Sequence, residues 1–248
     1  MTASTTLAPD TYLSHIRADT ARMADLAARD LEAAIPSCPG WDVREALLHT
    51  GEVYSHKVTC MRTGRSPEDW NHGPAQGEDP LEWFATRTEE LLGELGERDP
   101  TSPAFTWYEP QQNVAFWLRR MAQETVVHRV DIEAAFDVVT PVDDGLAVDG
   151  VDEVLDWFLA YQADDVGPDG PGRGTVAVRT GDHLWRVTLD PDDVVLAREP
   201  GPAEAVVSGE PSELLLWLWG RRPQAAVTVE GDQGLVDAMR ARLQVVTQ

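Results

Sequence analysis

The chain has 248 residues, 42% of them hydrophobic, and a formal net charge of -23 from 20 basic and 43 acidic side chains. Because a phosphate backbone is bound by clustered lysine and arginine, this charge argues against nucleic acid and anionic membrane surfaces as partners. No apolar run approaches the roughly 20 residues of a membrane span, and the N-terminus lacks the basic start and apolar block of a signal peptide. Two cysteines, Cys38 and Cys60, do not make a disulfide framework, so we expect a reducing, cytoplasmic setting and a nucleophilic role for neither thiol.

The first part of the chain has the apolar spacing of α-helices. In the segment 10–35, Leu13, Ile16 and Met23 fall near one helix face. Asp42 begins the next helix with a D-x-x-E capping box. The expected helices cover residues 10–35, 42–62, 80–99, 113–136 and 144–164, with polar loops at 63–80 and 99–112.

The hydrophobic pattern changes after residue 165. Segment 165–174 is dense in glycine and proline and is the best linker candidate. Beyond it, apolar residues alternate with a period of two. The expected elements are a hairpin at 174–193, strands at 194–201, 203–211 and 225–232, and helices at 212–222 and 234–244. We therefore expect an α+β protein, with a helical bundle over residues 1–165 and a small α+β domain over residues 174–248.

Two separated helical stretches carry candidate metal ligands. In the first, His49, Glu52 and His56 lie on one helix face, and in the second, Glu124 and His128 share a face because they are four apart. A buried carboxylate needs a cation or a metal, and two imidazoles with one carboxylate leave zinc a fourth position open, as in catalytic sites. The residues alone leave two interpretations open, a metal site or ordinary polar residues of packed helices.

The stretches CPGWDVREALLH, ending at His49, and ETVVHRVDIEAA, containing Glu124 and His128, resemble the mycothiol-dependent maleylpyruvate isomerase family. The segments SGEPSELLLWLWGRRP and VTVEGDQGLVDAM resemble its C-terminal domain. The resemblance implies an N-terminal DinB-like four-helix bundle and a C-terminal domain related to sterol-carrier-like folds. It further implies that His49, Glu124 and His128 bind one divalent metal, with zinc as the expected ion, and that a mycothiol-like thiol is the cosubstrate.

A divalent metal with an open position can deprotonate a bound thiol. Thiolate addition to the cis double bond of maleylpyruvate, rotation and elimination would give the trans isomer, whereas addition without elimination would be an S-transferase reaction. We therefore expect a metal-dependent isomerase or transferase that acts on a small electrophilic substrate. Two alternatives remain: a non-catalytic protein that binds a metal or an apolar ligand, and a metal-assisted hydrolase.

Four further residues are weighed as parts of the site. Arg221 matches an arginine of the family's C-terminal motif, and its planar fork suits a substrate carboxylate. Alternatively, Arg221 and Arg222 are cations at a helix C-terminus, and a substrate anion would be held by the metal alone or by Arg129. His56 matches no family ligand and is expected to be structural, exposed or adjacent to the ligands. The expected partners are the substrate and the thiol, for a monomer or homodimer.

Overall fold

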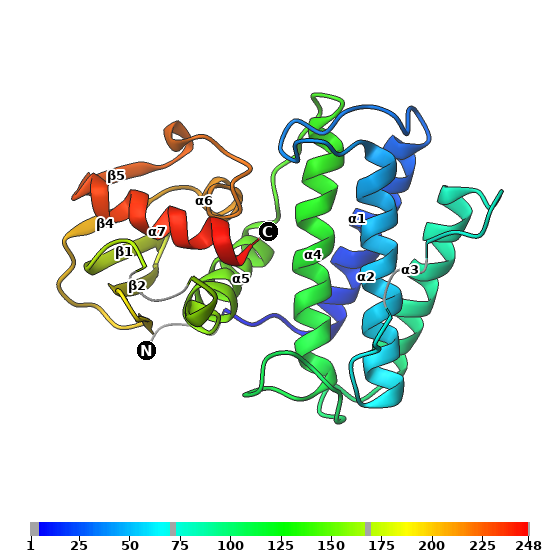
Figure 1. Cartoon of the computed structure of the whole chain (residues 1–248), viewed down its shortest axis with the longest axis horizontal. Coiled ribbons are helices and arrows are strands. Elements are labelled where there is room, and N and C mark those ends of the chain that lie inside the picture. Colours follow the sequence, from blue (N-terminus) through cyan, green and yellow to red (C-terminus); the bar gives the residue numbers. More distant parts are fainter. Residues whose placement is uncertain (1–4, 70–72, 167–169, 248) are drawn as a thin grey trace. The chain divides into compact units, whose positions relative to one another are not determined.

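The computed structural model describes residues 5–69, 73–166 and 170–247, which fold into two units (Figure 1). Leu7–Thr140 form the first, called the bundle unit, and Pro141–Gln248 belong to the second, called the sheet unit. The predicted class is confirmed: an N-terminal helical bundle is followed by a small α+β domain.

The described residues of the bundle unit form four helices: α1 (Pro9–Ala27), α2 (Val43–Thr63), α3 (Pro80–Glu97) and α4 (Val114–Ala134). α1 packs mainly on α4, and α2 packs mainly on α3. The predicted inner face of α1 is confirmed, because Ile16, Met23 and Leu26 are fully buried. α1 ends earlier than predicted, and Ala34 instead pairs with Asp42 in an isolated β-bridge. Among the described residues, no helix is both long and apolar enough to cross a membrane.

α2 approaches α3 most closely at Gly51. A Cβ atom at this position would overlap the ring of Trp83, which is buried on α3. A glycine inside a helix costs about 0.5–1 kcal/mol relative to alanine, so the close contact with a large aromatic ring is the compensating gain. The contact fixes one face of α2, and His49, two residues earlier in the helix, projects from a different face.

In the part of the sheet unit that the structure describes, five strands form one mixed sheet in the order β3-β2-β1-β4-β5. They are β1 (Gly174–Thr180), β2 (His183–Asp190), β3 (Asp193–Ala197), β4 (Ala205–Ser208) and β5 (Thr228–Gly231). β1 pairs parallel with β4 and the other pairs are antiparallel, so the predicted hairpin is confirmed as β1 and β2. The helices α6 (Pro211–Leu218) and α7 (Gln233–Val246) follow strands of this sheet, and α7 packs against β1, β4 and β5.

The predicted boundary at 165–174 needs correction, because the two units divide between Thr140 and Pro141. α5 (Asp144–Glu153) and the π-helix that continues it (Val154–Ala160) belong to the sheet unit. Asp152 at the end of α5 accepts hydrogen bonds from Trp185 Nε1 at 2.8 Å and from Arg198 Nε at 2.6 Å. A helical period does not reveal which core a helix joins. Residues 167–169 of the predicted linker lie outside the described residues.

Candidate metal centre

A tight corner leads the chain into α2. Gly40 has a φ of +90°, and Trp41 N donates to Cys38 O at 2.9 Å, which is the geometry of a type II turn with proline then glycine at its centre. Asp42 follows as N-cap, and its predicted capping box with Glu45 is confirmed, with both hydrogen bonds at 2.9 Å. The corner therefore fixes both the start of α2 and the position of Trp41.

The three predicted ligands come together between α2 and α4. His49 Nε2 lies 3.4 Å from Glu124 Oε1, and His128 Nε2 lies 3.3 Å from the same oxygen. One ligand atom from each of the three residues lies within 4.8 Å of the others, and the searched part of the chain contains no other such group of histidine, cysteine or acidic residues. The helix spacing that placed Glu124 and His128 on one face thus has the predicted result, and His49 faces them.

The separations fit a four-coordinate divalent ion. Ligand atoms about 2.0–2.2 Å from a tetrahedral zinc lie about 3.3–3.6 Å from one another. The 3.4 Å and 3.3 Å separations at Glu124 Oε1 fall in this range. Two imidazole nitrogens and one carboxylate oxygen are a zinc-type donor set that leaves a fourth position for another ligand. The side chains present therefore fit the implied metal.

Arg120 keeps the Glu124 carboxylate charged. Its guanidinium bonds Glu124 Oε2, one helix turn away, and leaves Oε1 facing the two histidines. Burial alone would raise the pKa of Glu124, but the Arg120 charge and hydrogen bonds from His128 and His49 hold this pKa well below its usual range. Arg120 was not predicted as part of the site, although its i−4 spacing from Glu124 is visible in the sequence.

A second carboxylate orients His128. Asp131, fully buried, lies with Oδ2 at 3.1 Å from His128 Nδ1, while its Oδ1 accepts from Ser37 Oγ at 2.6 Å. Because a carboxylate only accepts, Nδ1 carries a proton and Nε2 is the nitrogen that faces Glu124. Burial would lower the pKa of His128, but the hydrogen bonds with Asp131 and Glu124 raise it to about 9. A divalent ion would take the place of the proton on Nε2.

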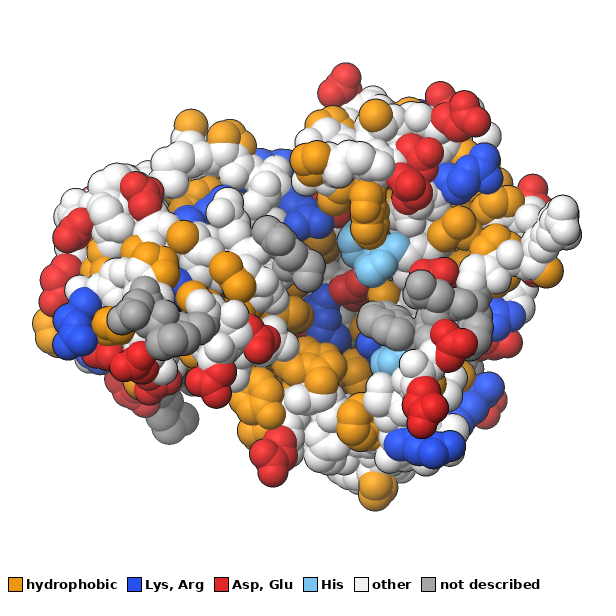
Figure 2. Space-filling model, in the orientation of Figure 1, with side chains coloured by type: hydrophobic (Ala, Val, Ile, Leu, Met, Phe, Trp, Pro, Cys, Tyr) orange, Lys and Arg blue, Asp and Glu red, His pale blue; other side chains and the backbone are white. Residues whose placement is uncertain are grey.

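Aromatic packing positions both histidines. The Trp41 ring stacks on His128 with centroids 6.1 Å apart and lies 5.1 Å from His49, and the two imidazoles meet edge to face at 5.0 Å. The side chain of His49 is 35% exposed, against 10% for His128, so the ligand set is open on the His49 side. Figure 2 shows histidine side chains at the surface over α2 and α4, beside acidic and basic side chains.

Further polar residues lie along α2 beyond the three ligands. Lys57 Nζ is 3.0 Å from His56 Nδ1, and Cys60 Sγ is 3.6 Å from the same nitrogen. Burial lowers the pKa of His56 to about 4, with the Lys57 charge adding to the effect, and burial raises the pKa of Cys60. His56 does not join the ligand group, and its position beside Lys57 matches the structural or adjacent role expected from the sequence.

The predicted cations have local partners. Arg129 donates to Glu133 at 2.7 Å and to Thr140, so it serves the packing of the bundle rather than the ligand group, and its suggested role as counter-charge is corrected. In the sheet unit, Arg221 Nη1 donates to Trp219 O at 2.8 Å at the end of α6, and Arg222 Nε bonds Glu213 at 3.0 Å. These contacts agree with the alternative in which Arg221 and Arg222 are cations at the C-terminus of a helix. A substrate role for Arg221 stays a prediction.

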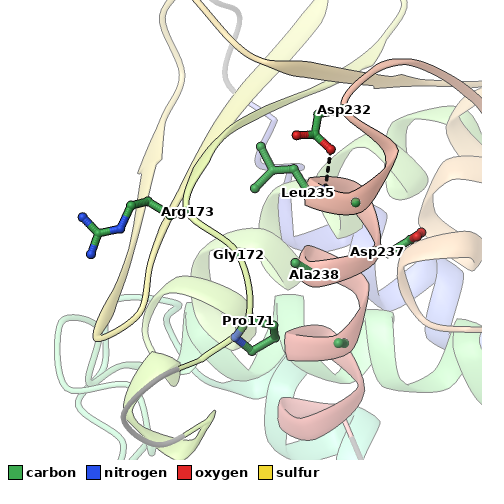
Figure 3. A pocket seen from close by; sticks show the side chains of 9 residues that line it. Pro171, Gly172, Arg173, Asp232, Leu235, Asp237 and Ala238 are labelled. Carbon is green, nitrogen blue, oxygen red and sulfur yellow. Dashed lines mark hydrogen bonds between the residues drawn. The ribbon is translucent and has the colours of Figure 1, made fainter.

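A depression in the sheet unit offers no comparable set of groups. It has a volume of about 560 Å³ and lies between residues 171–173 and α7 (Figure 3). Asp232 is engaged as the N-cap of α7 through Leu235 N at 3.2 Å, and Arg173 and Asp237 point to opposite sides. Catalytic pockets need convergent polar groups. The ligand group on α2 and α4 therefore remains the candidate site.

A helical bundle that presents two histidines and a carboxylate from facing helices, followed by an α+β domain, defines a class of bundle proteins with a candidate metal centre. Residues 13–133 match the family model of the mycothiol maleylpyruvate isomerase N-terminal domain, and residues 145–238 match that of the MDMPI C-terminal domain. These two matches span most of the chain, and the gap between them contains the division of the two units. The chain belongs to the mycothiol-dependent maleylpyruvate isomerase family.

Solved structures agree with this assignment at the level of the fold. A crystal structure of a mycothiol-dependent maleylpyruvate isomerase aligns with a TM-score of 0.62 at 17% identity, and that of a histidine-to-alanine mutant aligns with 0.63 at 15% identity. Each alignment covers 92% of this chain and 96% of the other. The sequence has no significant match among curated proteins.

Proposed function

We propose that this protein is a metal-dependent enzyme that uses a low-molecular-weight thiol, such as mycothiol, to isomerise or add to a small electrophilic substrate such as maleylpyruvate. The observation that carries the proposal is the convergence of His49, Glu124 and His128 within 4.8 Å in a member of this family. A bound divalent ion, with zinc the expected one, would lower the pKa of a coordinated thiol and make the thiolate available at neutral pH.

The surrounding side chains prepare the ligands for this task. Arg120 holds one carboxylate oxygen of Glu124, and Asp131 fixes the ring of His128, so two of the three ligands keep their orientation without a metal. Trp41 packs against both imidazole rings and restricts their rotation. Preorganised groups of this kind lower the cost of assembling the reactive geometry.

The thiol must come from outside the chain. Cys60 is fully buried and burial raises its pKa, which disfavours the reactive thiolate, and neither cysteine joins the ligand group. Addition of an external thiolate to the cis double bond leaves a single bond that can rotate, and elimination of the thiol then gives the trans product. If the adduct is released instead, the reaction is an S-transfer. A reducing cytoplasm would supply such a thiol.

The proposal is tested by metal analysis of the purified protein followed by a thiol-adduct assay. Maleylpyruvate and a generic electrophile are each incubated with mycothiol and the metal-loaded protein, and trans product is separated from adduct. Isomerisation or adduct formation that stops on chelation is the expected result. Metal binding without either product would favour a non-catalytic binding protein, and thiol-independent hydrolysis would favour the metal-assisted hydrolase.

Replacing Asp131 by asparagine should weaken metal binding by about 10- to 100-fold, because partners that orient a ligating histidine typically contribute this much. Asparagine keeps the shape but loses the charge that fixes Nδ1–H of His128. Metal affinity is measured by competition with a chelator. Ser37→Ala, which removes only the hydrogen bond to the other Asp131 oxygen, should have a smaller effect. Unchanged affinity in Asp131→Asn would show that His128 needs no orienting partner.

Replacing Arg221 by alanine should lower kcat/KM for an anionic substrate by about 10- to 150-fold, because one charge-assisted contact is worth about 1.5–3 kcal/mol. Metal content should stay at the wild-type level. Arg222→Ala is the matched control, since Arg222 is paired with Glu213. If both variants turn over substrate equally well, Arg221 serves only the end of α6, where it bonds Trp219 O.

A further inference from the structure

A buried hydrogen bond joins α2 to α4 behind the candidate metal centre. Tyr54 on α2 and Thr125 on α4 are both fully buried, and the Tyr54 hydroxyl lies 2.6 Å from Thr125 Oγ1. The Thr125 hydroxyl donates its single hydrogen to Met121 O at 2.5 Å, so Tyr54 is the donor in the bond between the helices. Burial raises the pKa of Tyr54, and the Glu124 charge adds to this effect, so the phenol keeps its hydrogen.

The ring of Tyr54 is itself held in place by packing. It stacks on Phe84 of α3, with ring centroids 6.1 Å apart and planes inclined by 28°, and Phe84 is buried as well. Packed helices lie about 8–10 Å apart, at a distance set by the side chains at their contact. A rigid ring that extends from α2 and ends in a hydrogen bond to α4 is therefore a spacer of fixed length between these two helices.

The spacing of α2 and α4 decides whether the three candidate ligands meet. Glu124 and His128 come from one helix, so their separation of 3.3 Å does not depend on the position of α2. The 3.4 Å between His49 Nε2 and Glu124 Oε1 spans the two helices. Because ligand atoms of a tetrahedral zinc lie about 3.3–3.6 Å apart, a displacement of α2 by about 1 Å would take His49 out of this range.

The hydrogen-bonded pair and the ligand group lie on different sides of the contact between α2 and α4. Tyr54 follows His49 by five residues, about 140° around the helix, and Thr125 follows Glu124 by about 100°. The side chains of His49 and Glu124 are 35% and 15% exposed, whereas Tyr54 and Thr125 are fully buried. Tyr54 therefore acts on the ligands through the position of α2.

We propose that Tyr54 is a positioning residue of the candidate metal centre, whose hydrogen bond to Thr125 sets the separation of α2 and α4 at which His49 completes the ligand group. This inference rests on the proposed function for the metal, whereas the position of His49 can be measured without one. The close approach of Gly51 to Trp83 supports it, because this contact holds the same segment of α2 against α3.

The first test compares crystal structures of the metal-free wild type and Tyr54→Phe. We expect the separation of His49 Nε2 from Glu124 Oε1 to increase by about 0.5 Å or more in the variant, which is the tolerance of a preorganised site. The separation of His128 Nε2 from the same oxygen should keep its wild-type value, since both groups belong to α4. An unchanged separation of His49 from Glu124 in Tyr54→Phe would overturn the proposal.

The second test measures the affinity for zinc by competition with a chelator. Tyr54→Phe should bind zinc about 10-fold more weakly than the wild type, at the low end of the roughly 10- to 100-fold that orienting partners contribute, because Tyr54 acts indirectly. Tyr12→Phe is the matched control and should bind like the wild type. It removes the hydroxyl of a buried tyrosine on α1, which accepts from Leu7 N at 3.1 Å. Equal zinc affinities of the two variants would refute the positioning role.

A double-mutant cycle separates positioning from stability. Thr125→Val keeps the shape but deprives the buried Tyr54 hydroxyl of its acceptor, whereas in Tyr54→Phe/Thr125→Val both sides of the contact are apolar. The double variant should therefore be more stable to denaturant than Thr125→Val, yet bind zinc no more tightly. Thr125→Ser keeps the acceptor and should bind zinc like the wild type. Zinc affinity that rises and falls with stability across these proteins would show that the hydrogen bond is structural only.

The outcomes separate this inference from the proposed function. A wild type that binds no metal would reject the proposed function, and the metal-free crystal structures would still decide whether Tyr54 positions His49. A wild type with zinc and thiol-dependent turnover, but with equal zinc affinity in Tyr54→Phe, would retain the enzyme and reject the positioning role. If Thr125→Val does not fold, the crystal structures and the comparison of Tyr54→Phe with Tyr12→Phe decide.

Discussion

Replacing His49 by alanine is expected to remove the bound metal and to reduce thiol-dependent turnover by about 10²- to 10⁴-fold, because a catalytic metal typically supplies several kcal/mol of stabilisation. His49 is one of the three candidate ligands, and the two that remain both come from α4. Its side chain is 35% exposed, so the substitution leaves a small gap at the surface rather than a cavity in the core. Elemental analysis and the thiol-adduct assay measure the two losses.

The matched control for this variant is His15→Ala. His15 lies on α1 of the same unit and does not belong to the ligand group. This variant should retain about one metal ion per chain and full turnover, with circular dichroism confirming that both variants are folded. A His49→Ala protein that holds as much metal as His15→Ala would contradict the three-residue metal site.

The local parts of the site could be predicted from the sequence because they depend on residues close together in the chain. The capping box at Asp42 fixes the start of α2, and the four-residue spacing puts Glu124 and His128 on one face of α4. The match between two distant stretches and one family then joined His49 to the pair. Each of these inferences uses the helical period or a short motif. The structure agrees with the predicted start of α2 and with the predicted grouping of the three side chains.

The partners of the ligands could not be predicted in the same way. Ser37 reaches Asp131 from 94 residues away, and no local pattern marks that contact. Arg120 and Asp131 do have helical spacing to the ligands, but the same spacing occurs at ordinary surface pairs. Only packing shows which of them are buried against the site.

Domain assignment failed for a related reason. The period of α5 is helical, and the sequence therefore grouped it with the helices before it. Hydrogen bonds from Trp185 and Arg198 to Asp152 instead join the end of α5 to the sheet unit. The role of Arg129 was misjudged for a similar reason. Its partner Glu133 lies four residues further along the chain, but Thr140, which hydrogen-bonds to both Arg129 and Glu133, reaches them only after the chain has turned back.

Glu133 is the centre of that buried network, and its replacement by alanine should have the largest effect on stability. The carboxylate is fully buried and accepts from Arg22 Nε at 2.9 Å, Arg129 Nη1 at 2.7 Å and Thr140 N at 2.8 Å. Asp19 lies 3.3 Å from Arg129 Nε and is the remaining acid of the group. Removing one partner of a buried ion pair costs about 3–5 kcal/mol, because the other charge stays buried without full compensation.

The expected loss is measured by denaturant and thermal unfolding of the full chain, with Glu90→Ala as the control. Glu90 pairs with Arg87 at 3.1 Å with about a third of its side chain exposed, so its loss should cost less than about 1 kcal/mol.

The effect of Glu133→Ala should also depend on pH. Burial would raise the pKa of Glu133, but hydrogen bonds from Thr140, Arg22 and Arg129 hold it below the ordinary 4.5. The contribution of the ionised Glu133 carboxylate to the free energy of unfolding is therefore fully present above pH 4.5 and is lost as the pH falls through the folded-state pKa. The stabilities of the wild type and Glu133→Ala should converge in acid. Equal stabilities of Glu133→Ala and Glu90→Ala at neutral pH would show that Arg22 and Arg129 find other compensation, and that the network does not hold α1 to α4.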